Sequence, residues 1–226
     1  GPADAKWLEP DERAAIISRL EAEERSTAAS AHGAFGQALR SGRLWALAFL
    51  YFSIIITFYG VSFWLPQILQ QLSGLGDLTV AFLSALPYVV AAIGMVYVAR
   101  LSDRTGKRAQ YIAVCAIIGA AGFLATAAVT SPVPSMLALS LTALGVWGTL
   151  GPFWAMPPAF LRGTAAAGGI AVINSVGNIG GFAGPYVVGY VRDVTGSFAA
   201  GLWVMAACLA AGAIISAGLA RSMRRS

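Results

Sequence analysis

Long stretches without charge constrain this chain more than any other feature of its sequence. No Lys, Arg, Asp or Glu occurs at 44–76, 109–161 or 163–191. Only 11% of the residues are charged and 58% are hydrophobic, whereas a soluble globular domain carries roughly a quarter charged residues. Such stretches cannot be loops in water, so the sequence predicts a chain that folds within lipid.

Turn signals divide these stretches into helices of membrane length. A bilayer core of about 30 Å needs roughly 20 apolar residues per helix. Clusters of turn-forming and polar residues mark breaks at 73–77, 102–108, 131–134, 162–164 and 193–196. We therefore expect an all-α membrane protein, a six-transmembrane-helix bundle with spans at about 44–69, 79–99, 109–130, 134–160, 167–190 and 199–220.

The basic residues are distributed unequally between the two sides of the expected membrane. If the segment 1–43 is cytoplasmic, fourteen of the fifteen Lys and Arg residues face the cytoplasm and Arg192 alone lies outside. This asymmetry satisfies the positive-inside rule and puts both ends of the chain in the cytoplasm, the second as a tail at 221–226. The net charge of +5 then reflects topology, and we expect no nucleic-acid partner.

The polar segment 1–43 is typical of a cytoplasmic connector that contains an amphipathic helix. Pro10 suits the first helical position, and Ala14, Ile17 and Leu20 form an apolar stripe. Two interpretations remain open: a connector lying against the membrane face, or a regulatory or partner-binding helix. His32, the one histidine, lies in this segment and is expected to be solvated.

The sequence offers little for catalysis, a metal or a cofactor. Cys115 and Cys208 both fall inside expected spans, where a small buried apolar side chain is the natural interpretation. The spans contain no nucleophile with a neighbouring base and no pair of carboxylates. We therefore expect that the chain is not an enzyme and holds neither metal nor cofactor.

The chain resembles itself at an offset of 90 residues. The segment 94–106 matches 184–196 at five of thirteen positions. Each segment closes the second helix of a set of three, but the expected topology puts the two copies on opposite sides. This pattern predicts an inverted 3+3 repeat, which is typical of secondary transporters.

The first copy of this repeat ends in a charged turn whose spacing suggests a gate. Gly94 would let a neighbouring helix approach closely, and Gly106 would permit a tight turn. Asp103 could cap a helix end or pair with a basic residue of another bundle, with Arg104 and Arg108 beside it. The alternative interpretation is that these charges only set the orientation of the loop in the membrane and have no role in a gate. The pattern resembles the loop signature of the major facilitator superfamily, between the second and third helices of each half.

Further motifs sharpen this resemblance, at 5–8, 63–68, 152–157, 169–185 and 193–198. They resemble the anion:cation symporter family, in particular bacterial tartrate and phthalate type permeases. The match covers nearly the whole chain but only the C-terminal half of such a transporter. It implies alternating-access, proton-coupled symport of a small organic anion, such as a hydroxy-dicarboxylate, sugar acid or aromatic carboxylate. It also implies the bacterial cytoplasmic membrane and an upstream six-helix half as partner.

Four residues are candidates for contact with a solute. Counting from the break at 162–164, Trp154 and Asn174 each lie roughly 12 to 18 Å into the bilayer, near its midplane. Asn178 lies one turn beyond Asn174 on the same face, and Tyr59 lies near the middle of the first span. The resemblance implies that Trp154 and Asn174 contribute to the substrate cavity. The competing interpretation is interhelical packing for the amides and lipid contact for the ring.

No expected span contains an ionisable acid or base. Charge pairing with an anion and proton transfer by a carboxylate would therefore have to come from the upstream half. Two alternatives remain: a transporter of a neutral or drug-like solute, and a non-transporting membrane sensor.

Overall fold

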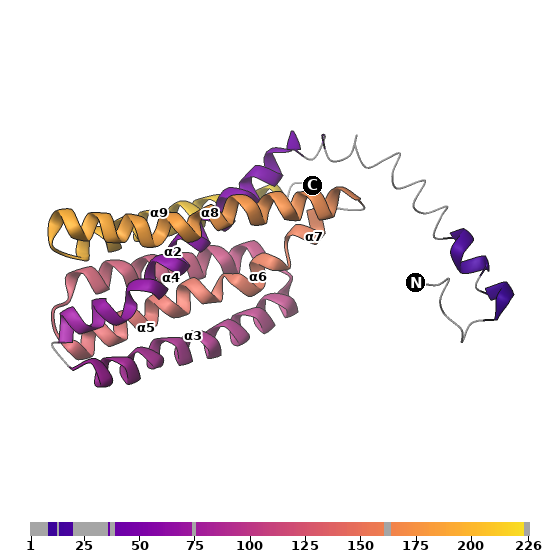
Figure 1. Ribbon diagram of the computed structural model, residues 1–226. Coiled ribbons are helices and arrows are strands. Elements are labelled where there is room, and N and C mark those ends of the chain that lie inside the picture. Colours follow the sequence, from indigo (N-terminus) through magenta and orange to yellow (C-terminus); the bar gives the residue numbers. More distant parts are fainter. Residues whose placement is uncertain are drawn as a thin grey trace.

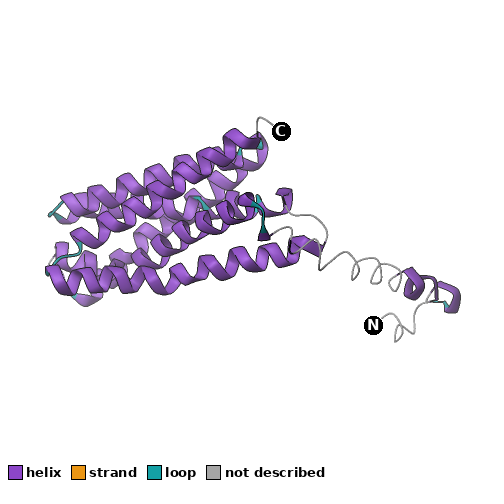
Figure 2. Cartoon of the chain, turned by 90° about the horizontal axis from the view of Figure 1, so that it is seen from above, coloured by secondary structure: helices purple, strands orange, loops and turns teal. Residues whose placement is uncertain are grey.

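The protein is an antiparallel bundle of long helices, seen in a computed structural model that describes residues 9–12, 14–19, 36, 39–73, 76–160 and 164–223. Six of its helices are long and apolar enough to cross a membrane, and no strand occurs within the described ranges. Figure 1 shows the helices side by side, and Figure 2 shows that short loops join them. In chain order the helices are α2 (Gly42–Ser73), α3 (Asp77–Thr105), α4 (Arg108–Ala128), α5 (Pro132–Gly148), α6 (Leu150–Trp154), α7 (Pro157–Phe160), α8 (Thr164–Thr195) and α9 (Ala199–Met223).

The second span continues further than the sequence indicated. We expected a break beginning at Ser102, but α3 runs on to Thr105. Its polar last turn extends the helix beyond the apolar span, where water can solvate the side chains, so nothing forces the backbone to unwind there. Gly106 is the C-cap residue that follows the helix, and the turn before α4 is shorter than expected.

The fourth span, expected over 134–160, is present as one membrane-length segment, Pro132–Trp154, but its helix is interrupted. The structure has three pieces there: α5, a short α6 and a short α7. Pro152 and Pro157 explain the interruption, because a proline has no N–H to donate within a helix and its ring crowds the preceding turn. The depth of Trp154, which we counted along a continuous helix, is therefore not given by residue number alone.

Two glycines at equivalent positions of the internal repeat have the same backbone conformation. Gly106 has φ +68° and Gly196 has φ +71°, the left-handed conformation that favours glycine. The Gly106 N–H donates to the Ser102 carbonyl at 2.9 Å, and the Gly196 N–H donates to the Arg192 carbonyl at 2.7 Å. The two turns are 90 residues apart in sequence and lie at opposite ends of the bundle (Figure 1). An inverted repeat requires this relation.

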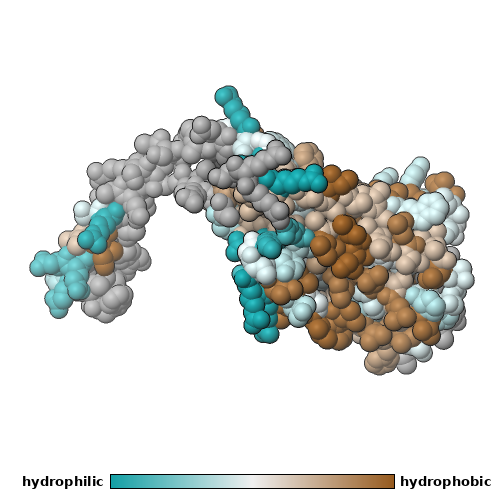
Figure 3. Space-filling model, turned by 180° about the vertical axis from the view of Figure 1, so that it is seen from behind, coloured by the Kyte–Doolittle hydropathy of each residue, from teal (hydrophilic) through white to brown (hydrophobic). Residues whose placement is uncertain are grey.

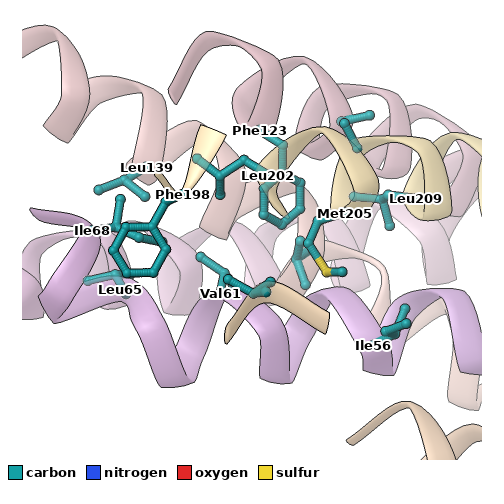
Figure 4. Close-up of a cluster of buried hydrophobic side chains, with 14 of the residues drawn as sticks. Ile56, Val61, Leu65, Ile68, Phe123, Leu139, Phe198, Leu202, Met205 and Leu209 are labelled. Atoms are coloured by element: carbon teal, nitrogen blue, oxygen red, sulfur yellow. The ribbon is translucent and has the colours of Figure 1, made fainter. Parts of the chain in front are cut away.

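The apolar core lies where α2, α4 and α9 meet. Phe123 of α4 and Met205 of α9 are fully buried, as is Leu65 of α2. Figure 4 shows side chains from these helices that point toward one another, among them Val61, Leu65, Ile68, Phe123, Leu202 and Met205. Among the candidate spans, the window of α2 is the most buried and those of α3 and α8 are the least buried. The bundle therefore leaves long faces of α3 and α8 uncovered.

Helices α2 and α8 touch through their backbones. A Cβ atom at Gly180 would lie 2.8 Å from the Ile56 nitrogen, and one at Gly184 would meet the Ile56 carbonyl oxygen. Small residues allow such close approach, which is a main source of helix association in membranes. This contact fixes the position of α8, the helix that carries the two asparagines.

The polar segment before the bundle is described only in part. Pro10 starts a helix, and residues 10–12 and 14–19 are helical. Ile17 is half-buried and Ala14 is exposed, while Leu20 and His32 lie outside the described residues. Cys115 is buried and Cys208 partly buried, each with a free thiol.

The surface of the bundle has the distribution that a membrane requires. Seen from behind, it carries a broad apolar belt, and long hydrophilic side chains gather at one end (Figure 3). Large aliphatic side chains lie on this surface: Ile93, Ile117 and Ile214 are between 59% and 74% exposed. Exposed apolar surface of this extent is stable in lipid and would aggregate in water.

Candidate functional site

Two amides lie together on the uncovered face of α8. Asn174 and Asn178 are both exposed. The Asn178 Nδ2 group donates to the Asn174 Oδ1 atom at 2.9 Å and to the Asn174 backbone oxygen at 2.8 Å. This pairing uses the Asn174 oxygen as acceptor, so the Asn174 NH₂ group remains available as a donor. Within the described bundle, Asn178 thus bonds along its own helix and does not connect two helices.

Trp154 lies at the end of α6 and is 37% exposed. Its ring lies edge-on to the ring of Tyr51, with centroids 4.9 Å apart. Tyr51 also stacks on Phe153, with centroids 4.8 Å apart and planes 12° apart. The interrupted fourth span therefore puts an indole beside α2, where two neighbouring rings hold it.

The rings of both tyrosines of α2 pack against glycines of α8. Tyr51 occupies the space that a side chain at Gly177 would need, and the Tyr59 ring lies 3.3 Å from a Cβ position at Gly181. Tyr59 is 40% exposed, whereas Tyr51 is 6% exposed. The turn of α8 that includes Gly177 also carries the two amides.

The structure thus brings three of the four candidate residues to neighbouring turns of α2 and α8, and the fourth adjoins them through Tyr51. We call this surface the amide–aromatic face and define it by Tyr59, Trp154, Asn174 and Asn178. It combines ring surface, an indole N–H and amide donors on a part of the bundle that its own helices leave uncovered.

Sequence reasoning missed Tyr51, although a signal was present. Tyr51 and Tyr59 are eight residues apart in one span, a spacing that keeps side chains on the same side of a helix. Their glycine partners, Gly177 and Gly181, are four residues apart in the motif that we had identified. Both pairs lie on one side of their helix, and comparing the two helices in this way would have indicated Tyr51 as a contact of Gly177.

An aromatic ladder extends the exposed face of α8 toward the Gly196 end. The rings of Phe182 and Tyr186 stack with centroids 5.7 Å apart, and those of Tyr186 and Tyr190 with centroids 6.3 Å apart. All three side chains are at least 60% exposed. This ladder was also missed, and its signal is an aromatic residue at every fourth position.

Four of the five candidate gate residues lie at the charged turn between α3 and α4, and the fifth, Gly94, lies earlier, in the interior of α3. Gly94 is buried, and a Cβ atom there would lie 3.0 Å from the Leu144 side chain of α5. Asp103, Arg104 and Gly106 are exposed. Asp103 does not cap α4, because Lys107 is the N-cap residue and no side-chain cap bond is present. Instead, the Asp103 Oδ1 atom lies 4.0 Å from the Arg108 Nη2 atom.

Arg108 connects this turn to the amide–aromatic face. Its Nη1 atom donates to the Ala155 carbonyl at 2.7 Å. Ala155 is the C-cap residue of α6, directly after Trp154. The C-terminal end of a helix carries partial negative charge, which favours a guanidinium there. Sequence reasoning missed this bond, since the partners are 47 residues apart and no pattern links them.

The fold and this face define a class of protein. Six membrane-length helices, two matching glycine turns at opposite ends and polar groups on an uncovered face are features of the secondary-transporter folds. A sequence model of the Major Facilitator Superfamily matches residues 5–185. The chain belongs to the Major Facilitator Superfamily, as its motifs predicted.

Known relatives agree with this assignment. The chain is 40% identical, over 98% of its length, to a putative tartrate transporter of Agrobacterium vitis, of which it covers 49%. It is 33% identical, over 93% of its length, to a quinolone resistance transporter of Acinetobacter baumannii, of which it also covers 49%. The fucose:proton symporter FucP of Escherichia coli has the same fold, with a TM-score of 0.70 at 16% identity over 81% of this chain and 44% of that one. The chain therefore spans about half the length of the relatives it matches.

Proposed function

We propose that the protein to which this chain belongs is a secondary active transporter of a small organic anion. The observation that carries the proposal is the amide–aromatic face. It presents hydrogen-bond donors and rings on the uncovered side of a membrane bundle, where polar groups need a partner or a wet cavity.

The residues of this face have complementary roles. The free NH₂ group of Asn174 would donate to a carboxylate oxygen or a hydroxyl of the solute, while Asn178 holds the Asn174 amide in that orientation. Trp154 would supply an apolar wall with one N–H donor, which in this bundle faces the Tyr51 hydroxyl, and Tyr59 would supply a second wall with a hydroxyl. Hydrogen bonds to an ionised group are the strong ones, so an anion gains most from these donors.

The middle parts of these helices carry no charged side chain that could neutralise the anion or transfer a coupling proton. The stretches 44–76, 109–161 and 163–191, which form most of the spans, contain no Asp, Glu, Lys or Arg. We infer that a second, upstream six-helix half supplies these groups and covers the amide–aromatic face, so that the solute binds between the two halves. Proton-coupled symport is part of this proposal and depends on that half.

The relatives support an anionic solute and keep one alternative in view. The similarity to a putative tartrate transporter favours a hydroxy-dicarboxylate or a related acid. The similarity to a quinolone resistance transporter favours a drug-like solute instead. We place the protein in the bacterial cytoplasmic membrane with both ends of this chain in the cytoplasm, on the strength of the positive-inside asymmetry.

Uptake by the full-length protein in proteoliposomes tests this function. We expect accumulation of a labelled hydroxy-dicarboxylate, stimulated by an acidic exterior and abolished by a protonophore. A panel of sugar acids, aromatic acids, neutral sugars and a quinolone separates the alternatives. Accumulation of neutral solutes alone would refute the anion proposal, and binding without accumulation would indicate a sensor.

Trp154 can be tested for the role of its ring and of its N–H separately. We expect Trp154→Ala to raise the KM for the transported acid about tenfold, because both the wall and the donor are lost. Trp154→Phe keeps the wall and should give a smaller increase. Labelled uptake at several solute concentrations measures this, with surface amounts as the control. Unchanged KM in both variants would remove Trp154 from the site.

The charged turn is proposed to act as half of a gate. We expect Asp103→Ala to lower the maximal rate about threefold or more while changing KM less than about twofold, because it shifts the balance of conformations and touches no solute. Asp193→Ala removes the same charge at the equivalent position of the repeat, at the other end of the bundle, and serves as the comparison. A large change in KM with intact turnover would contradict the gate role.

A further inference from the structure

A groove between α4 and α9 lies apart from the amide–aromatic face. Two hollows form it, with volumes of about 400 Å³ and 130 Å³, and both are lined by Gln110 and Ala220. The larger hollow also contacts Ala113, Val114, Ala217 and Arg221. The smaller one adds residues of the charged turn and the end of α9, namely Lys107, Arg108 and Met223. The hollows share two lining residues and lie between the same two helices, so we describe them together as the α4–α9 groove.

A buried hydrogen bond joins the two helices that line the groove. The Ser216 Oγ atom donates to the Ala109 carbonyl at 2.7 Å, and both residues are buried. This bond joins α9 to α4 next to the groove. Small side chains at Ala113, Ala217 and Ala220 then leave open the space that larger residues would fill.

The groove continues into a strongly apolar surface. Val114 and Ile117 of α4 are 54% and 59% exposed, and Ile214 of α9 is 74% exposed. Helix α9 packs mainly against α4, whereas α8 packs mainly against α2. The groove and the amides of α8 are therefore on different faces, and the groove side suits lipid chains rather than a polar cavity.

The mouth of the groove is positively charged. Lys107 and Arg108 line the smaller hollow and Arg221 lines the larger one, and Lys107 and Arg221 are exposed. The sequences of α4 and α9 contain no Asp or Glu, and Asp103 is the acid that pairs with Arg108. Two more basic residues, Arg224 and Arg225, follow α9 in the sequence. Basic pockets between membrane helices at the cytoplasmic side attract anionic headgroups.

We propose that the α4–α9 groove binds an anionic phospholipid. The phosphate lies between Lys107 and Arg221, and an acyl chain follows the alanine-lined groove toward Ile117 and Ile214. A free phosphate ion would use only the mouth and would leave the apolar groove empty, so the combination of charge and groove favours a lipid. The site is independent of which solute is transported.

The test measures lipid retention by the purified full-length protein. We expect native mass spectrometry to find phosphatidylglycerol retained in preference to phosphatidylcholine. The double variant Lys107→Ala with Arg221→Ala should retain about tenfold less phosphatidylglycerol. Arg40→Ala with Arg100→Ala removes the same charge from exposed positions outside the groove and should retain it normally. Equal loss in both double variants, or no lipid preference in the native protein, overturns the proposal.

A second variant distinguishes a lipid from a free phosphate ion. Ala217→Leu fills the groove and leaves the charges in place, so it should lower phosphatidylglycerol retention, and millimolar inorganic phosphate should not displace the lipid from the native protein. Unchanged retention in Ala217→Leu, or displacement by phosphate, overturns the assignment of the acyl chain. If Ala217→Leu does not fold, as judged by its thermal unfolding, the two charge variants decide the outcome.

Discussion

Asn174→Ala in the full-length protein is expected to lower the kcat/KM for uptake of the transported acid by about 10- to 100-fold. A hydrogen bond to an ionised group contributes about 1.5–3 kcal/mol, and about 1.4 kcal/mol corresponds to a factor of ten. Asn174 is exposed on this bundle, so the substitution removes little packing within it. Initial rates of labelled uptake measure the effect, together with the amount of protein in the membrane.

Ser175→Ala is the matched control for this prediction. Ser175 follows Asn174 on α8 and is also exposed, but it lies outside the amide pair. We expect normal uptake in this variant. Equal losses in both variants would mean that this turn of α8 matters for packing against the other half. Normal uptake in Asn174→Ala would remove the amide from the site.

Gly184→Ala is expected to destabilise the bundle itself. The added Cβ atom would meet the Ile56 carbonyl oxygen and lie 3.0 Å from the Gly60 nitrogen. Both are backbone atoms, which cannot rotate away as a side chain can. Overpacking typically costs about 1–3 kcal/mol, so we expect the Tm in detergent to fall by about 2–12 °C.

Gly218→Ala on α9 makes the same chemical change where no atom lies within 4 Å of the new Cβ position. Its Tm should be unchanged or slightly higher, because Ala favours a helix more than Gly does. Equal Tm values for the native protein and Gly184→Ala would refute the close contact between α2 and α8. Thermal unfolding followed by circular dichroism makes the comparison.

The bundle could be predicted from the sequence because a lipid bilayer requires apolar helices of a known length. Stretches without charge set the number of spans, and the charged turns set their ends within a few residues. The interruption of the fourth span was missed because Pro152 and Pro157 were considered as a motif and not as backbone constraints. Apolar length alone does not distinguish a straight helix from a broken one.

The candidate site was only partly predictable. The pairing of Asn174 with Asn178 follows from their spacing along one helix. The position of Tyr51 depends on Gly177, and the bond from Arg108 to Ala155 joins two separate spans. Contacts of this kind arise when helices pack, and a single sequence contains no periodic signal for them.

The contact of α2 with α8 has a consequence for how the bundle can move. Backbones that touch through glycines leave no layer of side chains on which one helix could slide past the other. We therefore expect α2 and α8 to move together as one rigid body during transport. We expect the bending to occur instead at the interrupted segment 149–156, where α5 is followed by the short α6. Because Arg108 holds Ala155 at this hinge, a change at the charged turn would be transmitted as a small rotation of the Trp154 ring.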